Sequence, residues 1–192
     1  MRKIFIVIAS FGLLASVSFA EAISTGSLPG SKFGSKLQSQ LTKNTKRTDY
    51  YAQKADAAKV AGKTELAEAY NACFLAKKKS VKSVQDYMAA AESAYSICRN
   101  NEALTPIIKN LLTYDIKGEH LKTRIDKLNK YKENCSKEAV TAEKQNKAEL
   151  ATNYKKLSNE LDKMAKSLKT YAESQGKFKA EHAKVLNLKK KK

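Results

Sequence analysis

The chain has 192 residues, and its 37 lysines and arginines against 19 acidic residues give a formal net charge of +18. Such an excess suits contact with anionic polymers or lipid surfaces, or serves only to keep the chain in solution. After residue 20 no stretch approaches the roughly 18 consecutive apolar residues of a membrane span, so the sequence predicts no transmembrane helix in the mature chain.

Residues 1–20 have the pattern of a cleavable secretory signal peptide. Arg2 and Lys3 precede a long apolar run. Small residues, Ser18 and Ala20, then occupy the −3 and −1 positions of a cleavage site. We therefore predict that the protein is exported, either to a periplasm or out of the cell.

Glycine, proline and serine dominate residues 21–34, which predicts a flexible leader. A capping-box pattern begins at Ser35, and apolar residues at helical spacing follow it. The pattern predicts a first helix over residues 35–61. Gly62 fits the position just after this helix, and Thr64 fits the N-cap of the next one.

The sequence pattern predicts a helical region over residues 35–116. The second helical segment of this stretch ends at Asn100. This segment is either one long helix or two helices separated by a break near residues 80–83. A further helix is predicted to start with Thr105 as N-cap and Pro106 as its first residue. The apolar residues of that helix are expected in the core.

Residues 117–188 are predicted to form one long C-terminal helix, followed by a lysine tail over residues 189–192. Apolar residues alternate at intervals of three and four along it, which indicates a coiled-coil seam with polar residues at Gln175 and His182. The seam residues are Tyr154, Leu157, Leu161, Met164, Leu168 and Tyr171. A helix this long has to pack on an earlier helix, on a copy of itself or on a partner protein.

Strand signals are almost absent from the sequence, because no segment alternates β-branched or aromatic residues between turns. The expected fold is therefore all-α: an elongated helical hairpin or bundle with a long C-terminal helix that resembles a coiled-coil strand.

Three cysteines, Cys73, Cys98 and Cys135, are an odd number for an exported protein, so at most one disulfide forms within the chain. If Gly118 marks a hairpin turn, Cys98 and Cys135 lie at similar distances on either side of it and are the favoured pair. The alternative is three buried, reduced thiols that act as small apolar residues.

No pattern in the sequence indicates a catalytic site. The histidines, His120 and His182, belong to no metal-binding motif, and the glycines form no phosphate-binding loop. We expect no catalytic residues, no metal ligands and no cofactor.

The favoured function is that of an exported, non-enzymatic binding or assembly protein of the cell envelope. Residues 23–48 contain five basic and no acidic residues, and the chain ends in Lys189, Lys190, Lys191 and Lys192. These basic ends are expected to contact an anionic envelope polymer or lipid surface, while the coiled-coil seam binds a protein partner or a second copy. Nucleic acid is not an expected partner of an exported protein.

Two alternatives come from other functional classes. The signal peptide, the strong positive charge and the alanine- and lysine-rich helices make the chain similar in composition to the Skp-type chaperones of outer-membrane proteins. That resemblance implies a periplasmic chaperone that holds unfolded clients. The other alternative is a secretion-system component similar to the exported helical minor pilins.

Overall fold

The computed structural model describes residues 32–107 and 120–190. Within them the chain forms α1 (Lys32–Val60), α2 (Thr64–Arg99), the 3-10 helix η1 (Glu102–Leu104), α4 (Leu121–Lys144) and α5 (Ala148–Lys190). Residues 105–107 are also helical, and no strand occurs in these two ranges. The all-α fold expected from the sequence is confirmed. The predicted signal peptide and the leader up to residue 31 lie outside the described residues.

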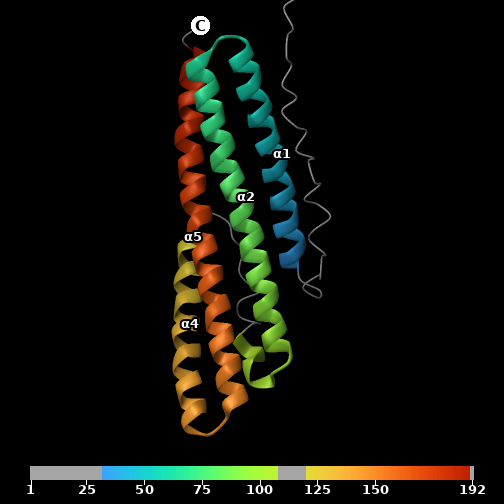
Figure 1. Cartoon of the computed structure of the whole chain (residues 1–192), viewed down its shortest axis with the longest axis vertical. Helices are drawn as coiled ribbons and strands as arrows, with labels where there is room; N and C mark the ends of the chain where they lie inside the picture. Colours follow the sequence, from blue (N-terminus) through green and yellow to red (C-terminus); the bar gives the residue numbers. More distant parts are fainter. Residues whose placement is uncertain (1–31, 108–119, 191–192) are drawn as a thin grey trace, which may run out of the picture.

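An antiparallel pair, α2 and α5, forms the long axis of the molecule (Figure 1). The first helix, α1, packs chiefly on α2 beside one half of this pair. The fourth, α4, packs chiefly on α5 beside the other half. The result is an elongated bundle whose third helix is α1 in one half and α4 in the other.

The connection between α1 and α2 is a tight turn that depends on Gly62. This residue has a φ of 69°, and its N–H donates to the Lys59 carbonyl at 3.0 Å, while the Lys63 N–H donates to the Ala58 carbonyl at 2.9 Å. These two bonds close the end of α1 in the manner that favours glycine at a positive φ. Gly62 therefore occupies the position predicted for it, whereas Thr64 is the first helical residue of α2 and not its N-cap.

The second helix is continuous, so the break considered near residues 80–83 does not occur. Ser80 donates its hydroxyl to the Ala76 carbonyl at 3.0 Å, and Ser83 donates to the Lys79 carbonyl at 2.7 Å. Because the serine hydroxyls find acceptors one turn back in the same helix, both residues are accommodated without a break.

The prediction of a single C-terminal helix over residues 117–188 is wrong, because the chain turns back between α4 and α5. Asn146 has a φ of 55°, with its N–H on the Glu143 carbonyl at 3.0 Å and the Lys147 N–H on the Ala142 carbonyl at 2.9 Å. Asparagine tolerates this left-handed conformation better than most residues and can replace glycine at a helix end. Small buried alanines continue on both sides of the turn, so apolar spacing alone did not reveal it.

The residue that caps the helical segment predicted to start at Thr105 also differs from the prediction. Asn101 is the capping residue, since its side chain accepts the Ala103 N–H at 3.1 Å. Thr105 itself is helical, and its hydroxyl donates to the Cys98 carbonyl at 3.3 Å. Most of the apolar stretch that was expected to enter the core, residues 108–116, lies outside the described residues.

The bundle contains two hydrophobic clusters with buried polar residues between them. The larger cluster fills the half that contains α4, and includes Leu128, Leu157, Leu161, Met164 and Leu168. The smaller one lies between α1, α2 and the end of α5, and includes Tyr51, Ala58, Tyr70, Cys73 and Val185. We call the six polar residues between them the polar layer: Asn44, Thr48, Lys77, Ser80, Ser174 and Gln175.

Candidate functional site

The predicted seam is internal to the chain. Leu157, Leu161 and Leu168 are fully buried in the larger hydrophobic cluster. Of the other seam residues, Met164 and Tyr171 are buried and Tyr154 packs at the edge of the same cluster. The seam that was expected to bind a second copy or a partner is thus covered by α2 and α4 of the same chain.

The polar layer joins α2 to α5 through a connected set of side chains. The hydroxyls of Ser80 and Ser174 lie 2.8 Å apart, and the Gln175 amide donates to Ser80 at 3.2 Å. The Gln175 carbonyl oxygen in turn accepts from the Lys77 ammonium at 3.1 Å. Gln175 was predicted as a polar residue within the seam, and its role there is to supply an acceptor for a buried cation.

Lys77 is only 1 % exposed, and no carboxylate lies within ion-pairing distance of it among the described residues. Its ammonium lies 3.9 Å from the centroid of the Phe178 ring, in addition to its bond to Gln175. Burial, together with the nearby charge of Arg47, lowers the pKa of Lys77 to about 8. Sequence analysis did not identify this residue, although the run Lys77-Lys78-Lys79 was visible in the sequence.

Aromatic rings surround the α5 side of this cation. Tyr51 meets Phe178 edge-on at 5.3 Å between centroids, and His182 stacks on Phe178 at 5.6 Å with 14° between the ring planes. His182, the second polar position predicted in the seam, is therefore part of a ring cluster. These contacts also show that the middle of α1 and this part of α5 lie at the same level of the bundle.

A second buried cation lies in the other half of the molecule. Arg124 of α4 donates to the hydroxyl of Tyr87 on α2, and its guanidinium lies 5.2 Å from the Tyr87 ring centroid. Burial raises the pKa of Tyr87 to about 12 despite the opposing effect of Arg124. This neutral phenol with an arginine is a structural bridge between two helices that otherwise pack on α5.

The predicted lysine tail begins at the end of α5, next to the turn between α1 and α2 (Figure 1). Lys189 places its ammonium 5.6 Å from the Tyr70 ring centroid, and a hydrogen bond to Tyr70 raises the pKa of this lysine. Lys190 is exposed at the helix end, and Lys191 and Lys192 lie outside the described residues. Lys59 of α1 adds a further exposed cation at this end.

The favoured Cys98–Cys135 disulfide is not formed, and all three cysteines are buried thiols. Gly118 lies outside the described residues, but the flanking helices are not the two arms of a hairpin, because α2 and α4 run in the same direction and each packs chiefly on α5 (Figure 1). A disulfide needs Cα atoms within about 7 Å. Burial raises the pKa of both Cys73 and Cys135 to about 11, which keeps these thiols protonated near neutral pH.

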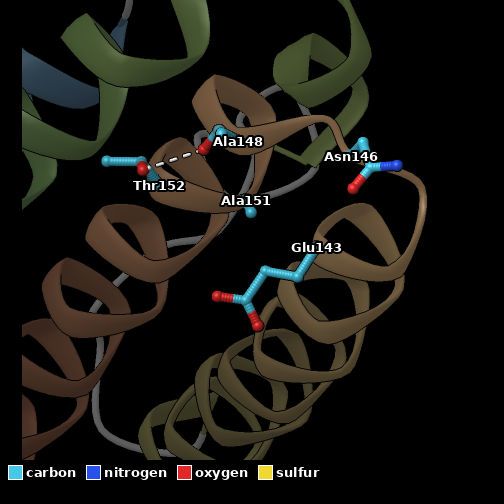
Figure 2. A pocket seen from close by; sticks show the side chains of 5 residues that line it. All are labelled: Glu143, Asn146, Ala148, Ala151 and Thr152. Atoms are coloured by element: carbon cyan, nitrogen blue, oxygen red, sulfur yellow. Dashed lines mark hydrogen bonds between the residues drawn. The ribbon is translucent and has the colours of Figure 1, made fainter.

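A small hollow lies beside the turn that joins α4 to α5. Figure 2 shows its lining, which consists of Glu143, Asn146, Ala148, Ala151 and Thr152. Two of its polar side chains already have partners within the chain, since the Glu143 carboxylate pairs with Lys155 at 2.6 Å and the Thr152 hydroxyl donates to the Ala148 carbonyl at 2.9 Å. The hollow therefore offers no set of convergent groups for catalysis.

The described part of the chain contains no group of three or more histidine, cysteine or acidic side chains that could hold a metal ion. Within residues 32–107 and 120–190, no helix combines the length and the apolar composition needed to cross a membrane. Comparison with known protein families, with curated proteins and with solved structures finds no match for this chain.

Proposed function

We propose that this protein is exported to the cell envelope and acts there without catalysis, as a helical binding protein for an anionic partner. The observation that carries the proposal is the basic end of the bundle. Lys189 and Lys190 lie there with Lys59, and none of the three has a carboxylate within 4.0 Å among the described residues. Lysines without an intramolecular ion pair can exchange small counterions for the charges of a polyanion.

The local charge balance at this end supports a weak and salt-sensitive contact. Asp56, Glu65 and Glu68 also lie near the turn between α1 and α2, and they reduce the net positive charge. The lysine tail adds two further cations beyond residue 190. We therefore propose that the attraction depends on the tail as a whole and weakens steeply as salt screens it.

A charge-reversal experiment tests the role of this end. The tail variant replaces residues 189–192 with glutamate in the chain that starts at Glu21, and its salt-dependent elution from immobilised heparin is compared with the unchanged chain. The matched control reverses four exposed lysines at the opposite end of the bundle: Lys137, Lys144, Lys147 and Lys156. We expect the tail variant to elute at lower salt than the control, although both lose the same charge. Equal elution of both variants would show that net charge alone governs retention.

In-cell cross-linking of the mature protein, followed by mass spectrometry, distinguishes this proposal from the alternatives. One recurrent envelope component would support a dedicated binding or assembly role. Many unrelated and incompletely folded proteins would support a chaperone instead. No contact described above favours the chaperone, because the apolar seam that would hold clients is buried within the bundle.

A further inference from the structure

Two basic segments, residues 43–47 of α1 and residues 177–179 of α5, lie at the same level of the bundle as the Lys77-Lys78-Lys79 run, although they are far apart from it in the sequence. The Lys77 ammonium bonds to Gln175 of α5, and the Ser80 and Ser174 hydroxyls lie 2.8 Å apart, so residues 77–80 face residues 174–175. Lys177 and Lys179 come directly after this contact on α5.

The first helix reaches the same level. Gln40 of α1 donates to the Tyr171 hydroxyl at 2.8 Å, and Tyr51 meets the Phe178 ring at 5.3 Å. The α1 residues between these two contacts therefore lie beside the polar layer, and the charge of Arg47 is close enough to lower the pKa of Lys77. We call the exposed cations of this level the basic belt: Lys43, Lys46, Arg47, Lys78, Lys79, Lys177 and Lys179.

The basic belt has few compensating charges. Asp49 on α1 and Glu173 and Glu181 on α5 are the acidic residues nearest to it along these two helices, and Glu181 pairs with Lys184. No belt residue takes part in an ion pair within the described parts of the chain. The buried ammonium of Lys77, which also lacks a carboxylate partner, adds positive charge beneath this surface.

We propose that the basic belt is a second contact of this protein with its anionic partner, in addition to the lysine tail, and that the partner is a flexible linear polyanion, such as an acidic or sulfated polysaccharide, that follows the belt around the bundle. The arrangement favours such a polymer over a bilayer, because the exposed belt cations are distributed over three helices of an elongated bundle. A flat surface can contact only one side of the bundle at a time, whereas a flexible chain can reach all of them. This inference rests on the proposed function and assigns it a different surface.

The test measures binding of fluorescein-labelled heparin, a linear sulfated polysaccharide, by fluorescence anisotropy across a range of salt concentrations. The belt variant replaces Lys43, Lys46, Lys79 and Lys177 with glutamine. The control variant replaces four exposed lysines at the opposite end with glutamine: Lys137, Lys144, Lys147 and Lys156. A tail variant with glutamine at residues 189–192 is measured in parallel, and circular dichroism verifies that every variant is folded.

We expect the belt variant to bind roughly tenfold more weakly at low salt and to show a shallower dependence on salt, because fewer counterions are released. The control variant is expected to stay within about twofold of the unchanged chain. Equal losses of heparin affinity in the belt and control variants would contradict the proposed role of the belt, because binding would then follow net charge. Loss in the tail variant alone would also overturn it, while leaving the proposed function in place.

Two further outcomes concern the partner and the proposed function itself. If vesicles that contain phosphatidylglycerol bind the unchanged chain as tightly as heparin does, and the belt variant loses both activities, the flexible polymer is the wrong occupant. If the unchanged chain binds neither probe at low salt, both the proposed function and the proposed role of the belt are contradicted.

Discussion

Lys77 is a cation held inside an apolar bundle, in contact with an amide oxygen and an aromatic ring. Taking an ammonium out of water is unfavourable unless a counter-charge compensates it, and here no carboxylate does. The nearby charge of Arg47 has the same sign and lowers the pKa of Lys77. The buried ammonium of Lys77 therefore lowers the stability of the fold. This loss of stability is consistent with a functional role for the positive charge.

Replacing Lys77 with methionine is expected to stabilise the fold at pH 7 by ~2 kcal/mol, because a chain of similar length fills the same space without a buried charge. Urea unfolding followed by circular dichroism measures this change. Ser83→Ala, at another buried polar position of the same helix, is the matched control. A clear loss of stability in Lys77→Met would contradict the unfavourable burial described here.

The same residue predicts a pH dependence whose sign follows from its lowered pKa. The folded state releases the Lys77 proton near pH 8, whereas the unfolded state keeps it up to about pH 10.5. Between these values the unfolded state binds more protons, so rising pH stabilises the folded state, by ~3 kcal/mol in total. Below pH 8 the lysine is charged in both states and its contribution is constant. The stability advantage of Lys77→Met over the unchanged chain should therefore shrink as the pH rises above 8 and reverse towards the upper end of this range.

The turn between α4 and α5 decides the course of the C-terminal half. It depends on one residue, Asn146, in a left-handed conformation that β-branched side chains resist. Asn146→Val is expected to destabilise the fold by ~1 kcal/mol or more, while Asn146→Gly should leave it unchanged or slightly more stable. Thermal unfolding of the pair measures the difference. Equal melting temperatures for the two variants would show that the turn imposes no such requirement.

The seam of α5 is buried within the single chain, where it contributes to the larger hydrophobic cluster. A lysine at position 161 or 168 would place a charge within the larger hydrophobic cluster, at an expected loss of ~3 kcal/mol or more for each substitution. Circular dichroism and urea unfolding should detect this loss. Sedimentation of the unchanged chain provides the complementary measurement, because a stable dimer that both substitutions dissociate without loss of helix would restore an intermolecular seam.

The sequence predicted the helices better than their arrangement. Apolar spacing identified the buried face of α5, and Gly62 identified the first turn, because both are local properties of the chain. The second turn was missed because Asn146 is a common surface residue whose left-handed conformation leaves no periodic trace. The basic belt was missed for a different reason, since Lys43, Lys79 and Lys177 come together only when three helices pack in one register. Long-range register cannot be read from one segment at a time.

At the scale of the whole molecule, the distribution of charge and the predicted export belong together. An exported protein with a net charge of +18 in its full sequence meets the anionic polymers and lipids of an envelope directly. Removal of the signal peptide would delete Arg2 and Lys3 and leave the basic belt and the lysine tail in place. The cationic surfaces therefore lie entirely in the predicted mature chain.

The export signal gives a direct expectation. Expression of the full sequence in a secreting host should yield a mature protein whose first residue is Glu21, because the small residues at positions 18 and 20 direct cleavage there. N-terminal sequencing of the exported protein measures the cleavage site. A full-length protein retained inside the cell, or an Ala20→Arg variant processed as efficiently as the unchanged chain, would contradict the signal.

We expect the polar layer to divide the bundle into two cooperative units. Hydrogen bonds between hydroxyls and amides join the two hydrophobic clusters less tightly than continuous leucine packing would, so one half can open while the other stays closed. Native-state hydrogen exchange should accordingly find slow amides around Leu157 and Leu161, and faster amides in α1, which buries fewer large side chains. A bundle that opens from its α1 half would expose the Lys77 ammonium, so transient unfolding and the positive charge offered to a polyanion would be linked.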